Sequence, residues 1–183
     1  MQATSNRVQY SRLRDGTIVR LRPIGPADRA RLAAGFAHLS PRSRYLRFFT
    51  PMPRLPQSVL QRLVATDGAN HVAIGAEIAP PVDQPEGVGV AHLFRREDDP
   101  TAAEVSIVVI DSRQRQGLGR VLLRELARVA RGLGIEKFTA TVLRENEPVR
   151  RLLESYQLPF KIIARGDHVE YEITLPDVVP AAA

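Results

Sequence analysis

Residues 114–119 read Gln-Arg-Gln-Gly-Leu-Gly, and they stand where an apolar segment gives way to an amphipathic one. The preceding residues 105–110 (VSIVVI) are rich in β-branched side chains, which is typical of a buried strand. After the turn, apolar residues recur at intervals of three and four, which predicts one face of a helix: Leu118, Val121, Leu122, Leu126, Val129 and Leu133. We therefore expect a tight turn between a strand and a helix.

This turn has the chemistry of a phosphate-binding loop. Gly117 and Gly119 lack Cβ atoms, so backbone amides could close on a ligand there. The start of a helix also offers unpaired N–H groups and a partial positive charge. However, no Lys-Ser or Lys-Thr follows as in a P-loop, and a dinucleotide-binding turn would need a third glycine. A turn that needs glycine only for its geometry remains the alternative.

A second segment follows the predicted helix. Residues 137–143 (KFTATVL) are predicted to form a strand, and Asn146 precedes another helix that runs through Ser155. Asparagine before Glu147 and Pro148 is a good helix N-cap, so Asn146 has a structural as well as a ligand-binding interpretation.

Together these segments resemble the GNAT superfamily of N-acetyltransferases. Gln114, Gly117 and Gly119 match the pattern Gln/Arg-x-x-Gly-x-Gly/Ala of its acetyl-CoA pyrophosphate loop, and the resemblance covers roughly residues 13–175. It implies acetyl-CoA as co-substrate. The cofactor-binding positions that it implies are Ile107, Val108 and Val109 on the strand, Gln114, Arg115, Gln116, Gly117, Leu118, Gly119 and Arg120 at the loop, and Asn146 near the pantetheine arm. Arg115 and Arg120 could equally be solvated arginines at a helix start.

The order of predicted elements agrees with this resemblance. Strands are predicted over residues 17–22, 71–78, 87–94, 102–110, 137–143, 160–164 and 169–175, with helices beginning near residues 26, 40, 56, 118 and 147. The family implies a mixed α/β (α+β) fold, in which four to five helices flank a mostly antiparallel sheet of six to seven strands. We expect one domain over residues 14–175, between a flexible N-terminus (1–13) and a flexible tail (176–183).

The composition excludes several kinds of protein. The chain has 183 residues, of which 44% are hydrophobic and 25% charged, as in ordinary globular domains. It has no cysteine, its four histidines show no metal-ligand spacing, and no run approaches the roughly 20 apolar residues of a membrane span. The N-terminus has no apolar signal core. We expect a cytoplasmic enzyme without a metal or membrane partner.

The net charge of +6 could suggest a nucleic-acid partner. However, Lys137 and Lys161 are the only lysines, and the 24 arginines are spread along the whole chain. Nucleic acid is therefore the weaker inference, and a polyanionic cofactor would use a few of these arginines.

Acetyl transfer to an amine needs a base, because the amine is mostly ammonium at neutral pH. Glu104, at the start of the central strand, is the first candidate, and its apolar neighbours could raise its pKa. An exposed carboxylate at a strand edge is the alternative interpretation, and His92 is the second candidate base. Residues 39–49 (LSPRSRYLRFF) resemble bacterial protein-lysine acetyltransferases of the Pat type, in which a glutamate at the place of Glu104 is the general base.

One position departs from the wider superfamily. Many GNAT enzymes carry a tyrosine seven residues after the asparagine, where it protonates the leaving thiolate, but this chain has Leu153 there. Tyr156 lies at a different angle on the helix and does not inherit the role. Pat-type enzymes also lack this tyrosine.

The leading hypothesis is an acetyl-CoA-dependent N-acetyltransferase that acts on a protein lysine by direct attack. The alternatives are a small-molecule amine acetyltransferase and a non-catalytic acyl-CoA-binding sensor, which Leu153 favours slightly. A homodimer is compatible with this fold.

Overall fold

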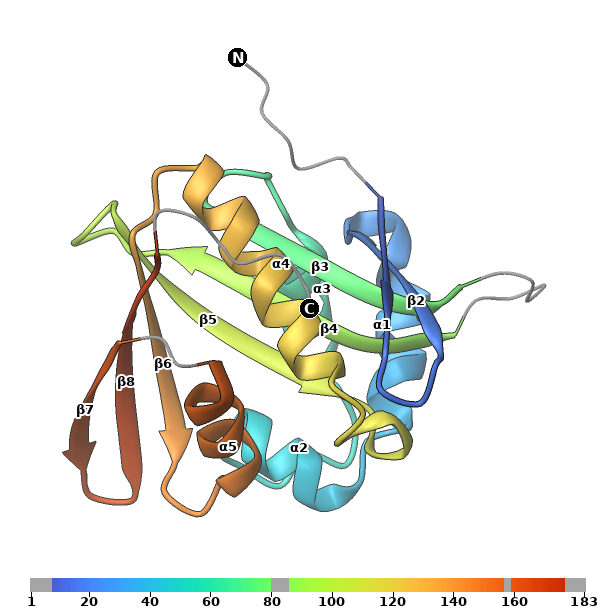
Figure 1. Cartoon of the computed structure of the whole chain (residues 1–183). Helices are drawn as coiled ribbons and strands as arrows, with labels where there is room; N and C mark the ends of the chain where they lie inside the picture. The colour runs from blue at the N-terminus through green and yellow to red at the C-terminus, as the bar shows by residue number, and fades with distance from the viewer. Residues whose placement is uncertain (1–7, 80–85, 157–158, 177–183) are drawn as a thin grey trace.

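The computed structural model describes residues 8–79, 86–156 and 159–176. Its strands are β1 (Gln9–Arg12), β2 (Ile18–Pro23), β3 (His71–Ile78), β4 (Gly87–Arg95), β5 (Ala102–Val109), β6 (Lys137–Leu143), β7 (Phe160–Arg165) and β8 (His168–Thr174). They form one sheet in the order β1-β2-β3-β4-β5-β6-β8-β7 (Figure 1). Among these strands only β5 and β6 pair in parallel. The predicted mixed, mostly antiparallel sheet is confirmed, with one strand more than expected.

The additional strand is β1. The sequence predicts loose order up to about Arg14, because QYSR has no apolar alternation and no β-branched residue. In the structure a turn at Asp15 and Gly16 folds this segment back, and it pairs from Gln9 opposite Leu21 to Arg12 opposite Ile18. An edge strand is held by backbone hydrogen bonds to a single neighbour, so this weak side-chain pattern is sufficient.

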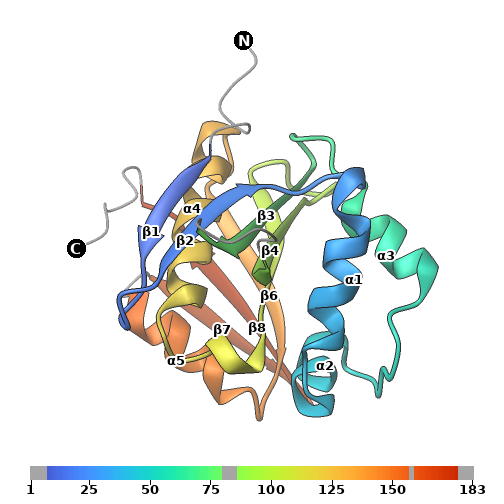
Figure 2. The same ribbon diagram turned by 90° about the vertical axis from the view of Figure 1, so that its right-hand side faces the viewer.

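In the described part of the chain, five α-helices surround the sheet: α1 (Arg29–Ala37), α2 (Pro41–Phe48), α3 (Gln57–Val64), α4 (Leu118–Gly132) and α5 (Glu147–Tyr156). Helices α1 and α3 lie on one face, and α4 and α5 on the other (Figure 2). The helix predicted to begin at Pro26 opens with a 3₁₀ turn over Pro26–Asp28. Within the described residues, no helix has the length and apolar character to cross a bilayer.

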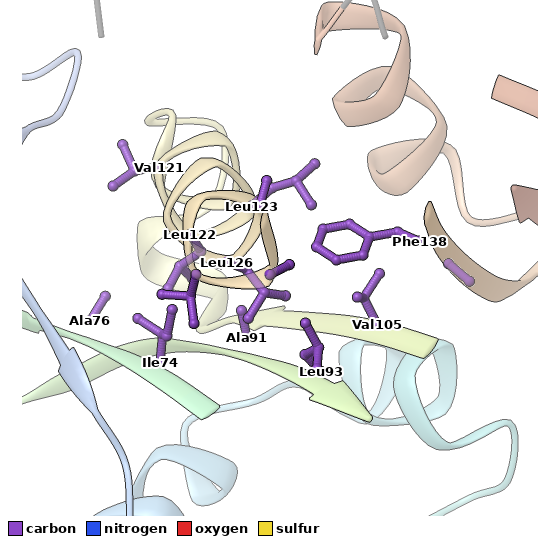
Figure 3. Close-up of a cluster of buried hydrophobic side chains, with 14 of the residues drawn as sticks. Ile74, Ala76, Ala91, Leu93, Val105, Val121, Leu122, Leu123, Leu126 and Phe138 are labelled. Carbon is purple, nitrogen blue, oxygen red and sulfur yellow. The ribbon is translucent and has the colours of Figure 1, made fainter. Parts of the chain in front are cut away.

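The main core lies between α4 and the sheet. Leu122 and Leu126 of α4 point toward Ile74 and Ala91 on the strands (Figure 3). Gly89 of β4 permits this close packing, because a Cβ there would lie 3.0 Å from Leu122 Cδ1. Each large aliphatic side chain buried in this way stabilises the fold by roughly 1.5–3 kcal/mol.

The sheet opens between β5 and β6. The two strands pair over three positions, and the last pair is Glu104 opposite Thr139. Both strands continue, to Val109 and Leu143, but they diverge from each other (Figure 1). In a regular sheet, neighbouring strands stay about 4.8 Å apart and exchange hydrogen bonds. Beyond Glu104, the edge of β5 therefore faces a widening gap.

Candidate active site

The turn at residues 114–119 lies just beyond the end of β5. Gln114 is extended, whereas Arg115 and Gly117 have φ angles of 61° and 94°, in the left-handed region. This conformation suits glycine, but it costs a residue with a side chain about 1–2 kcal/mol. The strain at Arg115 is of the kind that accumulates in ligand-binding loops.

The same turn leaves the start of α4 uncapped. Gly117 occupies the N-cap position and has no side chain to cap the helix. The helical hydrogen bonds begin with Val121 N donating to Gly117 O at 3.1 Å. The amides of Leu118 and Gly119 belong to the first turn, where no intrahelical acceptor exists, and such amides bind anions.

Gly119 has room for a side chain. A Cβ there would meet Leu152 Cδ2 at 3.5 Å, which is an ordinary van der Waals contact. Glycine inside a helix costs about 1 kcal/mol relative to alanine. The packing of the protein therefore does not account for glycine at this position.

Other predicted cofactor-binding residues differ in what they present to the gap. Leu118 is buried in the core, so that only its backbone could meet a ligand, whereas the side chains of Arg115 and Arg120 are exposed. The Gln114 side chain is already engaged, because Nε2 donates to Val109 O at 3.1 Å and to Ser43 Oγ at 3.3 Å. Half-buried side chains follow Glu104 on the diverging strand at Ile107, Val108 and Val109, and Gln116 is half-buried in the loop.

An ionised side chain that the sequence analysis missed connects the loop to α2. Asp111 accepts hydrogen bonds from Ser40 N at 2.9 Å and from the hydroxyls of Ser40 and Ser43 at 2.8 Å each. Burial acts to raise the pKa of Asp111, but these hydrogen bonds outweigh it and hold the pKa below its usual value. Some 70 residues separate the partners, so a local sequence pattern could not reveal the contact.

Asn146 is buried at the start of α5. Its Oδ1 accepts a hydrogen bond of 3.4 Å from Val149 N, and its carbonyl accepts another from Arg150 N. The structure therefore gives Asn146 the N-cap role. Its predicted contact with the pantetheine arm stays a prediction.

Leu153 is 6% exposed and belongs to the main core. It can neither donate nor accept a proton, as the sequence indicates. Tyr156 ends α5, and its side chain lies outside the described residues.

Glu104 stands at the vertex of the opening between β5 and β6. Its side chain is exposed, which agrees with the alternative interpretation of a carboxylate at a strand edge and not with burial among apolar neighbours. Its charged neighbour is Arg47 of α2, which donates to Ser106 Oγ at 2.8 Å. Burial lowers the pKa of Arg47 to about 10, and the nearby Glu104 carboxylate limits the fall.

His92, the second candidate base, is 2% exposed. Its Nδ1 lies 3.2 Å from Nε2 of His71. Burial, with smaller contributions from Arg47 and His71, lowers the pKa of His92 to about 3. A histidine with this pKa stays neutral near pH 7 and is a weak proton acceptor, which favours Glu104 as the base.

The mixed sheet opens between two parallel strands, beside a glycine turn at a helix start, and this is the arrangement that the resemblance to acetyltransferase domains leads us to expect. The chain belongs to the Acetyltransferase (GNAT) family, which matches residues 50–157, more than half of its length. The predicted family is thereby confirmed.

Named relatives support the predicted likeness to Pat-type domains. Acetyltransferase Pat from Mycolicibacterium smegmatis is 29% identical over 149 residues, which are 78% of this chain and 41% of Pat. Acetyltransferase PA5475 from Pseudomonas aeruginosa is 28% identical over 140 residues, covering 76% of this chain and 74% of the relative. The crystal structure of the GNAT domain of S. lividans PAT matches with a TM-score of 0.83 at 29% identity, over 92% of this chain and 97% of that domain. This chain thus spans less than half the length of the mycobacterial Pat.

Proposed function

We propose that this protein transfers an acetyl group from acetyl-CoA to a protein lysine side chain, with Glu104 as the general base. One observation carries the proposal: the pairing of β5 with β6 ends at Glu104, so a carboxylate stands where the sheet opens. The family relationship supplies the reaction class.

The residues around the opening fit acetyl-CoA. The uncapped start of α4 suits a pyrophosphate, and the unexplained glycine at 119 leaves space for one to approach the helix. The exposed side chains of Arg115 and Arg120 can add positive charge. When bound, acetyl-CoA supplies a thioester carbonyl that an amine can attack. Backbone groups of Ile107–Val109 would face it across the gap, where an N–H donor stabilises developing negative charge on oxygen.

The side chains on the face of β5 that carries Glu104 would serve the acceptor. Glu104 takes the ammonium proton directly or through a water, and its exposure lets that proton pass on to solvent. Arg47, held by Ser106, fixes a positive charge beside the carboxylate. Leu153 offers no proton to the leaving thiolate, so we assign this protonation to solvent.

An acceptor on the surface of a protein can reach this site. Glu104 is exposed, and Tyr45 and Phe49 of the neighbouring α2 segment are exposed aromatic side chains. Phe49 packs edge-on against His168 of β8, with ring centroids 5.2 Å apart, and so connects α2 to the far side of the opening. Aromatic side chains of this kind are typical of protein-binding surfaces.

The test is incubation with radiolabelled acetyl-CoA and a cell lysate divided into protein and small-molecule fractions. We expect label on protein, and Glu104→Gln should lower turnover about 100-fold or more while acetyl-CoA binding persists. The exposed Glu97 in the β4–β5 turn provides the matched control, because Glu97→Gln should change neither property.

The other outcomes separate the alternatives. Label on small amines alone would make the protein a small-molecule acetyltransferase. Acetyl-CoA binding without any transfer would favour the non-catalytic sensor. Normal turnover in Glu104→Gln would remove Glu104 from the mechanism.

A further inference from the structure

A cavity of about 80 Å³ lies between helices α1–α3 and the face of the sheet opposite α4. Its walls are mostly apolar, with Leu32, Phe36, Phe48, Leu63 and Val90 among them. Of the described residues that we assign to catalysis or to acetyl-CoA, Val108 and Arg47 contribute to the wall, whereas Glu104, the glycine turn and Asn146 do not. The cavity is therefore distinct from the opening between β5 and β6.

His92 contributes a buried imidazole to this wall. The tautomer of His92 follows from the hydrogen bonds that His71 makes. The carbonyl of Ala65, 3.0 Å from His71 Nδ1, can only accept, so His71 Nδ1 carries a proton. Burial lowers the pKa of both histidines, so both rings are neutral near pH 7 and His71 Nε2 is an acceptor. His92 Nδ1 must then be the donor in the pair, and His92 Nε2 keeps a bare lone pair.

No donor among the described residues reaches His92 Nε2. A buried acceptor without a partner is unfavourable, so a ligand that supplies an N–H or O–H to it gains affinity. In contrast, the charged groups around the cavity already have partners. Arg22 pairs with Asp28 and Glu77, and Arg47 donates to Ser106.

The charge of the wall selects the class of ligand. Guanidinium groups of Arg22, Arg31 and Arg47 outnumber the carboxylates of Asp28 and Glu77, which disfavours a cation such as a protonated amine. The bare acceptor on His92 disfavours an anion. We propose that this cavity binds a small neutral molecule with an apolar body and one hydroxyl or N–H group, which donates to His92 Nε2.

A matched pair of probes tests this independently of acetyl transfer. Cyclopentanol carries the required donor, whereas cyclopentanone has the same ring and an oxygen that only accepts. In ¹⁵N NMR of the histidine side chains, cyclopentanol should shift the Nε2 resonance of His92 and bind about ten-fold more tightly than the ketone. His92→Leu should reduce the alcohol to the affinity of the ketone.

Gly35 of α1 provides a second variant that leaves the histidines intact. It lines the cavity, and a Cβ there would lie 3.8 Å from Gly87 O, so Gly35→Leu can fill the space with a good helix former. We expect this variant to fold and to lose cyclopentanol binding. Equal affinity for the two probes, binding that survives Gly35→Leu, no binding at all, or a proton observed on His92 Nε2 would each overturn the proposal.

Discussion

Gly119 of α4 faces Leu152 of α5, and a Cβ on residue 119 would lie 3.5 Å from Leu152 Cδ2. The fold therefore tolerates Gly119→Ala, and alanine should stabilise the helix by up to about 1 kcal/mol. If the pyrophosphate approaches α4 here, the added methyl group obstructs it. We expect urea unfolding to show equal or higher stability and calorimetry to show acetyl-CoA affinity lowered about ten-fold or more. Unchanged affinity would place the phosphates elsewhere.

Gly117 and Gly134 stand at opposite ends of α4, both in the left-handed region with φ angles of 94° and 76°. Alanine at either position should cost about 1–2 kcal/mol, because its Cβ disfavours this conformation. Only Gly117 belongs to the proposed loop, so Gly117→Ala alone should also weaken acetyl-CoA binding. Equal weakening by Gly134→Ala would show that the effect is a general loss of stability.

Arg22 forms ion pairs with two buried carboxylates, and its Nη2 lies 2.5 Å from both Asp28 Oδ1 and Glu77 Oε1. Its hydrogen bonds lower the pKa of Asp28, and with Arg20 they lower the pKa of Glu77 against the opposing effect of burial. Folded-state pKa values below the unfolded values of about 4 give stability that is present above pH 4 and lost as the pH falls through the folded values.

The variant Arg22→Met tests this cluster. At pH 7 it should cost about 3 kcal/mol, because Asp28 and Glu77 each lose an ion pair, while Arg20 still contacts Glu77. Near pH 3 the cost should shrink, since protonation removes those charges in the variant. Urea unfolding at both pH values measures the difference, and an equal cost at both would contradict the assignment.

Leu153 fills part of the core at the place where many relatives in the superfamily carry a tyrosine. Leu153→Tyr should destabilise the protein by about 1–3 kcal/mol through overpacking and should leave turnover no higher. Leu153→Phe is the control, because it adds the ring without the hydroxyl. Faster turnover in the tyrosine variant alone would show that thiolate protonation limits the reaction.

Local patterns predicted most of the fold. The three- and four-residue spacing after Gly117 predicted α4, and the β-branched run at 105–110 predicted most of β5, because burial of one helical face or of a whole strand leaves a periodic trace in the sequence. The edge strand β1 leaves no such trace. Its side chains are at most half-buried, and its order depends on backbone pairing with β2.

The site was less predictable than the fold. The glycine turn could be recognised because its backbone conformation restricts residue type. The exposure of Glu104 could not be predicted from the sequence. The alternation along β5 places residues 104 and 106 on one face, but it does not show how closely helices cover that face. The burial of His92 and the contact of Asp111 with α2 depend on residues far apart in the chain.

The contacts of Ser40 and Ser43 with Asp111, and of Gln114 with Ser43, have a consequence for engineering. In the proposed site, the α2 segment beside the acceptor also contacts the loop that we assign to acetyl-CoA. A chimaera in which another α2 segment lacked the two serines would be expected to bind acetyl-CoA less well, even though the exchange was meant to change only the acceptor. Grafts that retain both serines should separate the two properties.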